Sequence, residues 1–215
     1  MEKVAGGVHR VRGGVPRVMN VYLIEDEGGV TVFDGGVKSM AGAVQKAAAS
    51  LGPIKRVVLG HSHADHRGAA PAIAATGVPV FCHEAELADA RSDGGYHYFK
   101  LAELNFFARR IANHSLHKTW DDGPVPIEGT VAEGDEIAGF QVIHLPGHAP
   151  GLIALYRESD GLVLGSDVVY TLNPLSGRKG APRVPHEAFN MDTELARASL
   201  LKLSAVAPKT VWPGH

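Results

Sequence analysis

A short apolar strand that runs directly into a cluster of histidines is the feature that most restricts how this chain can fold. Val57-Val58-Leu59 is apolar throughout, which is typical of a strand buried on both faces of a sheet. The segment His61-Ser62-His63-Ala64-Asp65-His66 follows it and brings four metal-ligating side chains close together. In an extended segment residues two apart point the same way, so His61 and His63 can bind one ion. Asp65 and His66 point elsewhere once the chain turns into a helix, and they can bind a second ion.

The pattern around this strand predicts an α/β fold built from two similar halves. Short β-branched or aromatic runs predict strands at 18–25, 30–33, 57–59, 78–82, 140–145, 152–156, 162–164 and 210–212. Apolar residues at helical spacing predict helices at 40–51, 69–75, 84–90, 96–112 and from Asp192, the expected N-cap, onward. Most aromatic side chains of the helix at 96–112 are expected to pack into the core.

The whole chain, 1–215, is interpreted as one domain. The two helices at 84–90 and 96–112 form a helical insertion at about 84–117, and the Pro/Gly-rich stretch at about 121–129 is the expected boundary between the halves.

Three further potential ligands each follow an apolar strand, where α/β folds place their functional loops. They are His148 in Pro146-Gly147-His148, Asp167 in Gly165-Ser166-Asp167 and His215 in Pro213-Gly214-His215. A glycine directly before each of these two histidines allows the backbone to turn and the ring to approach an ion closely.

The complete set of motifs, in this order, resembles the metallo-β-lactamase-fold hydrolase superfamily over essentially the whole chain. The resemblance implies a four-layer αββα sandwich, in which helices flank two mixed β-sheets and the site lies at one edge of the sheets. It also implies the metal ligands: His61, His63 and His148 for a first ion, Asp65, His66 and His215 for a second, and Asp167 as the carboxylate between them. Asp34, in Val32-Phe33-Asp34-Gly35-Gly36, resembles an aspartate that orients a ligand histidine.

Five imidazoles and two carboxylates are donors that suit two Zn²⁺ ions per chain, and also iron or manganese. Two such ions lower the pKa of bound water and supply hydroxide near neutral pH. We therefore predict metal-assisted hydrolysis of an ester, lactone, thioester or amide of a small molecule. Asp65 is the expected proton shuttle to the leaving group. Tyr170 either donates a hydrogen bond to the developing oxyanion or leaves its hydroxyl in water at a strand end.

Departures from known branches narrow the substrate class. The β-lactamases of the superfamily generally carry cysteine or serine where this chain has Asp167, which disfavours a dedicated β-lactam hydrolase. Glyoxalase II-like thioesterases continue into a C-terminal helical domain, whereas this chain ends at His215, which disfavours a glutathione thioester. The short lactonase- and esterase-like members fit best. Arg67 is unusual for the family: it can bind a substrate carboxylate, but a solvated arginine at a helix start is the interpretation we favour.

Two other functions stay open. A persulfide dioxygenase-like enzyme would hold one iron with a subset such as His61, His148 and Asp167, and a non-catalytic metal-binding protein would bind metal without turnover. Metal analysis and substrate panels separate these possibilities.

Composition restricts the partners. Lys plus Arg number 21 against 23 Asp plus Glu, a net charge of −2 that gives no basic footprint for nucleic acid or an anionic membrane. Cys82 is the single cysteine, so no intrachain disulfide can form. Without a visible signal peptide or transmembrane span, a cytoplasmic location is expected, and the oligomeric state stays open.

Overall fold

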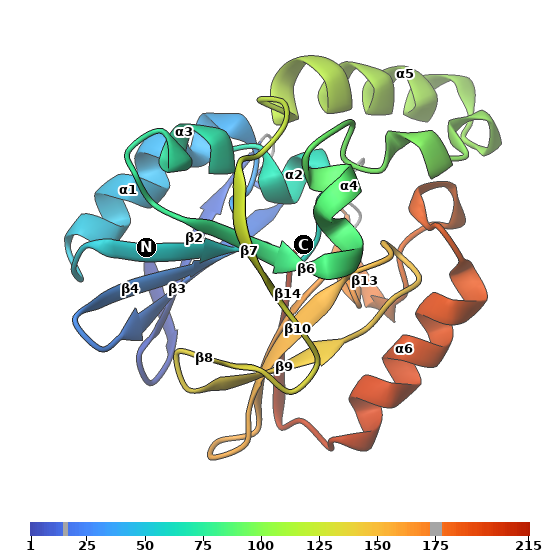
Figure 1. Ribbon diagram of the computed structural model, residues 1–215. Helices are drawn as coiled ribbons and strands as arrows, with labels where there is room; N and C mark the ends of the chain where they lie inside the picture. Colours follow the sequence, from blue (N-terminus) through green and yellow to red (C-terminus); the bar gives the residue numbers. More distant parts are fainter. Residues whose placement is uncertain (15–16, 173–177) are drawn as a thin grey trace.

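Alternating side chains along one strand explain how the fold is layered. On β3 (Met19–Asp26), Val21 and Leu23 belong to a hydrophobic cluster that contains helical residues, whereas Tyr22 and Ile24 belong to a cluster between two sheets. Successive residues of a strand point to opposite faces, so a strand buried on both faces must be covered twice. The computed structural model, which describes residues 1–14, 17–172 and 178–215, shows two sheets that pack together and helices on their outer sides (Figure 1).

The first sheet has seven strands in sequential order and is mixed: β1 to β4 are antiparallel, and β4 to β7 are parallel. Its strands are β1 (Glu2–Ala5), β2 (Val8–Gly13), β3, β4 (Gly29–Phe33), β5 (Ile54–Val58), β6 (Val80–His83) and β7 (Ile127–Val131). β7 therefore begins inside the stretch 121–129 that the sequence suggested as a connection, and its residues pair with β6 in the first sheet.

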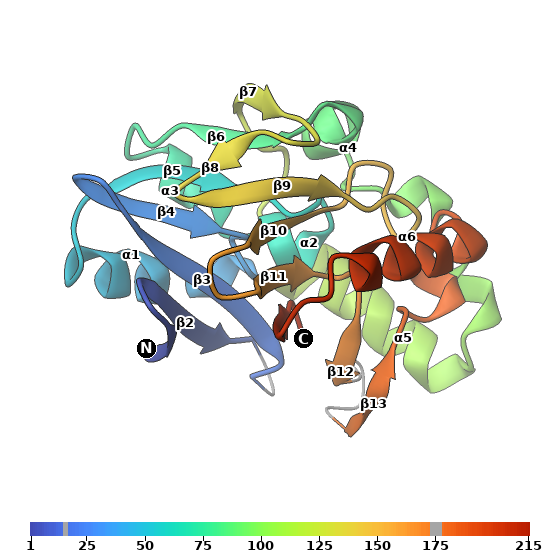
Figure 2. The same cartoon turned by 90° about the horizontal axis from the view of Figure 1, so that it is seen from below.

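The second sheet has five strands in the order β14-β11-β10-β9-β8 and is also mixed, because β14 runs parallel to β11 while the others are antiparallel. Its strands are β8 (Glu136–Ile137), β9 (Phe140–His144), β10 (Ile153–Arg157), β11 (Leu162–Ser166) and β14 (Thr210–Pro213). Figure 2 shows the last strand, in red, beside β11. A separate two-stranded ribbon pairs β12 (Tyr170–Leu172) with β13 (Lys179–Arg183).

Helices cover the outer faces of both sheets. Val44 and Ala48 of α1 (Ala41–Ala49) and Ile73 of α3 (Ala70–Ala74) are buried in the cluster on the first sheet. Leu203 of α6 (Thr193–Ala205) is buried against the second sheet, and the expected N-cap Asp192 accepts a hydrogen bond from Leu195 N at 3.0 Å. The predicted four-layer αββα sandwich with two mixed sheets is confirmed.

The segment between β6 and β7 differs from the sequence prediction. A 3-10 turn at Glu84–Glu86 leads into the helix α4 (Leu87–Ala90), as expected. The single helix predicted over 96–112 is wrong: 3-10 turns at Tyr96–Tyr98 and Leu101–Glu103 precede α5 (Phe106–His114) and a π-helical stretch, Ser115–Trp120. The chain is extended between the turns, because Lys100 N bonds to Ala188 O at 2.8 Å instead of continuing a helix.

The start of α5 carries a capping signal, since the Asn105 side chain accepts a hydrogen bond from Ala108 N at 2.9 Å. Phe106 and Phe107 are 63% and 75% exposed and do not pack into the core, whereas Tyr96 and Phe99 pack against a buried cluster. None of the helices in the described part of the chain combines the length and the hydrophobicity that a membrane span requires.

Arg67 is buried, and the interpretation of a solvated arginine is therefore wrong. Its side chain is 1% exposed at the end of α2 (Ala64–Arg67), and it forms two hydrogen bonds with the Asp121 carboxylate, at 2.7 and 3.1 Å. It also donates to the carbonyl oxygens of Asp89, Ala90 and Ser92. The guanidinium thus ties α2 to both ends of the segment between β6 and β7, and its donors are engaged by the protein.

We expect Arg67→Met to lower the free energy of unfolding by about 3–5 kcal/mol, because it leaves a partly buried carboxylate and buried carbonyl groups without their donor. Arg197→Met, which removes an exposed pair with Glu194, is the control and should change stability by less than about 0.5 kcal/mol. Chemical denaturation measures both. Equal stability of the two variants would contradict this assignment.

Candidate metal centre

Five chain segments meet at one edge of the sandwich, each directly after a strand. They carry Asp34 after β4, residues 60–66 after β5, His148 after β9, Asp167 after β11 and His215 after β14. All seven predicted ligands are buried, as is Asp34. The structure therefore brings together every metal-site residue that the sequence predicted.

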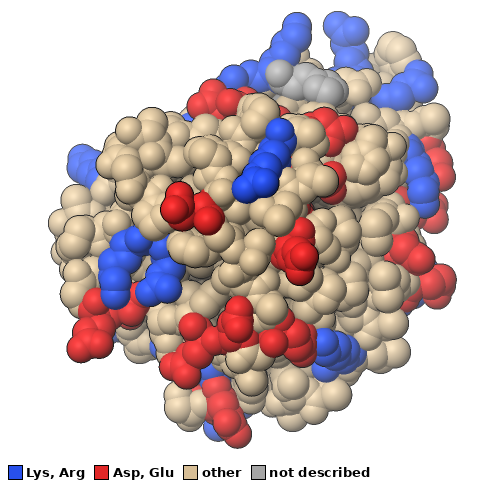
Figure 3. All heavy atoms as spheres, viewed as in Figure 1, with Lys and Arg blue, Asp and Glu red and all other residues tan. Residues whose placement is uncertain are grey.

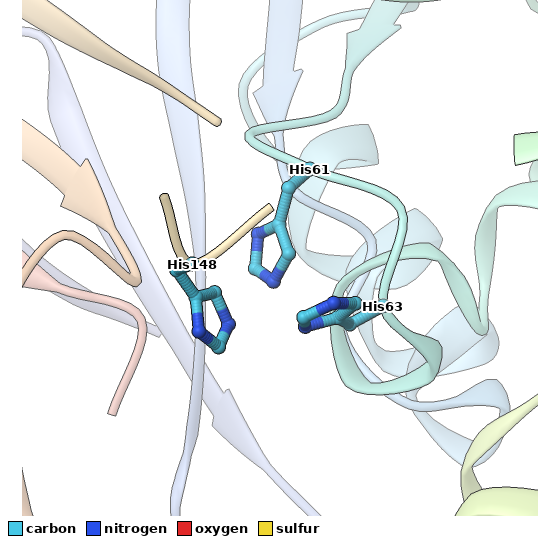
Figure 4. A group of neighbouring side chains, drawn as sticks. All are labelled: His61, His63 and His148. Atoms are coloured by element: carbon cyan, nitrogen blue, oxygen red, sulfur yellow. The ribbon is translucent and has the colours of Figure 1, made fainter. Parts of the chain in front are cut away.

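The first group consists of His61, His63 and His148, whose rings point toward one another (Figure 4). One potential ligand atom from each lies within 4.8 Å of the others. The second nitrogen of each ring is held from outside: His61 Nδ1 lies 3.2 Å from Ser166 Oγ and His148 Nδ1 lies 2.8 Å from Asn190 Oδ1. For His63 the arrangement is reversed, because Nε2 lies 2.7 Å from the Tyr98 hydroxyl.

The second group consists of Asp65, His66 and His215, again with one ligand atom each within 4.8 Å. His66 Nδ1 is 2.9 Å from Asp34 Oδ2, and His215 Nδ1 is 3.2 Å from Val18 O. A side chain at Gly214 would collide with Asp167 and His66, so the glycine before His215 is required for this close approach.

Asp167 lies between the two groups. Its Oδ2 is 3.5 Å from His148 Nε2 and 3.3 Å from His215 Nε2, and its Oδ1 is 3.2 Å from His66 Nε2. The Tyr170 hydroxyl donates a hydrogen bond to Asp167 Oδ2 at 2.7 Å, and Tyr170 is only 5% exposed. The interpretation of Tyr170 as a strand-end residue with its hydroxyl in water is therefore wrong.

Asp34 connects the segments that carry the ligands. Besides its contact with His66, it accepts hydrogen bonds from Gly60 N at 2.7 Å and from Ser166 Oγ at 2.9 Å. Asp34 and Ser166 have positive φ angles of 63° and 42°, a conformation that is uncommon for residues other than glycine. These hydrogen bonds hold both residues in that conformation, which is typical of functional sites.

The two groups differ in their protonation. Burial lowers the pKa of His61 and His63 well below its ordinary value, and neighbouring histidines add to the effect. Burial alone would also lower the pKa of His66 and His215, but Asp167 and the adjacent carboxylates outweigh it. They raise the pKa of His66 well above its ordinary value and that of His215 to about 9. Burial by itself would raise the pKa of Asp167, yet the same histidines hold it well below its usual range.

The buried donors of the centre fit metal ions. Within the described part of the chain, five buried atoms here lack a hydrogen-bond partner: Nε2 of His61, His66, His148 and His215, and Oδ1 of Asp167. Buried polar atoms are nearly always satisfied, and those that are not call for a bound group. Imidazole nitrogens and carboxylate oxygens are ligands for zinc, iron or manganese, so the residues present fit a two-metal site.

A small cavity of about 20 Å³ adjoins the centre. On one side it is lined by His63, Asp65, His148 and Tyr170. Its opposite wall is apolar and comes largely from the segment between β6 and β7, through Phe99, Ala112, Leu116 and Trp120, together with Phe189. A molecule that reaches the histidines therefore contacts an apolar roof.

Sequence reasoning missed the side chains that orient the ligands from outside. Ser166 stands beside Asp167 and could have been suspected from that position, but Asn190 and Tyr98 lie in stretches without any motif. Their partners become neighbours only in the folded chain.

Known proteins resemble this chain along nearly its whole length. The Bacillus subtilis (strain 168) protein "Probable metallo-hydrolase YflN" is 28% identical over 230 residues, which cover 99% of this chain and 85% of that protein. The solved structure of TTHA1623 in a di-iron-bound form is 27% identical with a TM-score of 0.69, over 96% of this chain and 91% of that one. The metallo-beta-lactamase family protein TTHA1429 from Thermus thermophilus is 26% identical with a TM-score of 0.68, over 98% and 74%. The sequence model of the Metallo-beta-lactamase superfamily matches residues 14–215, and this chain therefore belongs to that superfamily.

Proposed function

We propose that this protein is a metal-dependent hydrolase that holds two Zn²⁺ ions and cleaves an acyl bond of a small molecule, in an ester, lactone or thioester. The observation that carries the proposal is the set of unpartnered, buried imidazole and carboxylate atoms around Asp167. Membership of the superfamily and the resemblance to YflN support a metallo-hydrolase, and the di-iron form of TTHA1623 supports a dinuclear centre. The same donors bind iron, so the choice of zinc is part of the proposal.

Each side chain has a role in this proposal. His61, His63 and His148 bind the first ion, Asp65, His66 and His215 bind the second, and Asp167 lies between them as a shared ligand. When bound, the two ions supply a hydroxide nucleophile near neutral pH and polarise the carbonyl group of the substrate. Asp34 orients His66 through the contact at 2.9 Å.

Two residues at the cavity wall complete the chemistry. Asp65 lines the cavity, and its pKa is lowered because His215, whose Nε2 lies 3.4 Å from Asp65 Oδ2, and the charge of His66 outweigh the effect of burial. A carboxylate that is ionised at neutral pH can accept a proton and pass it to the leaving group. Tyr170 also lines the cavity, and its hydroxyl donates to Asp167 Oδ2 in this structure. We assign this hydroxyl as the donor to the carbonyl oxygen as negative charge develops there, a role in which its single O–H turns from Asp167 to the substrate.

The apolar roof favours an apolar acyl substrate. Phe99, Leu116 and Phe189 offer no charged group to a substrate phosphate or carboxylate, and Arg67 is occupied by Asp121. A volume of about 20 Å³ holds little more than a water molecule, so the segment that forms the roof must move to admit substrate. Figure 3 shows acidic side chains interspersed with basic ones over the middle and lower part of this face, while basic ones gather at its upper edge. The net charge of −2 supports the proposal that nucleic acid is not the substrate.

Replacing either of two proposed metal ligands should abolish turnover. We expect Asp167→Ala and His61→Ala to lose at least about 100-fold in hydrolysis of the best substrate from a panel of esters, lactones and thioesters, because each removes a metal ligand. Metal content measured by mass spectrometry should fall in parallel. Asp160→Ala, an exposed aspartate, is the control and should behave like the unchanged protein.

The outcomes separate the competing functions. About two zinc ions per chain together with hydrolysis support the proposal. One iron ion with oxygen uptake would support the dioxygenase-like function instead, and metal binding without turnover of any compound would support a non-catalytic protein.

The two groups should take up Zn²⁺ with different pH dependence. His66 and His215 have a raised pKa in the metal-free protein, so they carry protons at neutral pH that a metal must displace. Affinity at the second group should therefore rise with pH up to about 9, by as much as tenfold per pH unit for each proton displaced. His61 and His63 have a lowered pKa, so a metal has no proton to displace from these two rings and its affinity for the first group should depend less steeply on pH. Zinc titrations between pH 6 and 9 test this; a shared pH dependence would contradict it.

A further inference from the structure

Glu86 is a fully buried carboxylate that joins two ligand loops. It is 0% exposed, its Oε2 accepts a hydrogen bond from Ser62 N at 2.7 Å, and its Oε1 accepts one from Gly151 N at 2.7 Å. Ser62 lies between His61 and His63, and Gly151 lies three residues after His148. Among the described residues, Glu86 belongs to no ion pair. Its buried carboxylate is therefore stabilised by these two backbone amide donors.

Tyr98 contacts His63, which belongs to the first group together with His61 and His148. Its hydroxyl lies 2.7 Å from His63 Nε2, and the Phe99 ring packs edge-on against the His63 ring at 4.7 Å between centroids. Because Nε2 is engaged by Tyr98, Nδ1 is the nitrogen that His63 can offer to the first group. His61 and His148 offer Nε2 instead, since their Nδ1 atoms are engaged elsewhere.

The second group is held differently. His66 contacts Asp34, which directly follows β4, and His215 contacts Val18 O, which directly precedes β3; both strands belong to the first sheet. Glu86 and Tyr98 both belong to the segment 84–120, which also supplies most of the cavity roof. The first group therefore depends on this segment for the ring of His63 and for the spacing of its two loops, in addition to the contacts of Ser166 and Asn190. The histidine rings of the second group are held from the first sheet.

We propose that Glu86 and Tyr98 are positioning residues that fix His61, His63 and His148 as ligands for the first metal ion. Glu86 sets the spacing of the two loops through their backbone amides, and Tyr98 sets the ring orientation that presents His63 Nδ1. This inference rests on the proposed metal sites. It adds that the segment covering the substrate cavity also sets the geometry of one of the two metals.

Zinc titration of the metal-free protein, by competition with a chromophoric chelator, tests the inference. Glu86→Gln loses one acceptor oxygen and Tyr98→Phe loses only a hydroxyl, so each should weaken one of the two Zn²⁺ sites by about 10- to 100-fold and leave the other unchanged. Glu84→Gln alters an exposed glutamate in the same turn as Glu86, and Tyr96→Phe removes a hydroxyl that bonds to Leu116 O within the segment. Both controls should keep wild-type affinities.

Two backgrounds identify the weakened site. In His215→Ala, which retains the first group, Tyr98→Phe should still weaken Zn²⁺ binding; in His148→Ala, which retains the second, it should have no effect. Circular dichroism confirms folding, and Tyr98→Phe decides the matter if Glu86→Gln does not fold. Equal weakening of both sites, or of neither, would overturn the inference. Failure of the unchanged protein to bind two Zn²⁺ ions would overturn the proposed function instead.

Discussion

The carboxylate of Asp34 is the interaction on which the arrangement of the metal centre depends. It contacts Gly60 and His66 from the first half of the chain and Ser166 from the second sheet, so one buried side chain fixes the relative position of the two halves at the site. A buried carboxylate is stable only when its oxygens have donors, and three donors surround this one. The same contacts retain positive φ angles at Asp34 and Ser166, which aims both side chains inward at a cost in backbone strain.

This arrangement explains how so many polar groups can be buried together before metal binds. The first group avoids charge, because burial keeps His61 and His63 neutral. The second group uses charge, because the raised pKa of His66 and His215 lets their protons offset Asp65 and Asp167. The pKa values of the two groups are therefore shifted in opposite directions, although both groups contact Asp167.

How much the sequence could predict depends on whether a signal is local. A strand such as β5 can be predicted from its apolar run, and the metal-ligating residues His61 and His63 can be predicted because they follow that run directly. Arg67 has no such signal, because burial of a guanidinium requires Asp121 and three carbonyl groups from distant residues. The prediction of a helix over 96–112 was wrong for a related reason. The hydrogen bond from Lys100 N to Ala188 O is a tertiary contact that takes the place of a local helical hydrogen bond. Asn105, by contrast, is a local N-cap signal, although it lies inside the stretch of apolar residues at helical spacing.

The same distinction separates ligands from the residues that hold them. The proposed ligands follow strand ends, where the sheets of the sandwich fix the backbone. Their spacing can be recognised in short sequence motifs. Glu86 acts through backbone amides and Tyr98 through a ring nitrogen, so neither requires a recognisable sequence around its partner. Both lie in a segment whose outer face exposes Phe106 and Phe107 and whose inner residues line the cavity. In the proposed function this segment moves to admit substrate, and it also positions His61, His63 and His148, so substrate entry is linked to the geometry of the centre. Changes in this segment can therefore alter both substrate choice and metal affinity while every ligand stays in place.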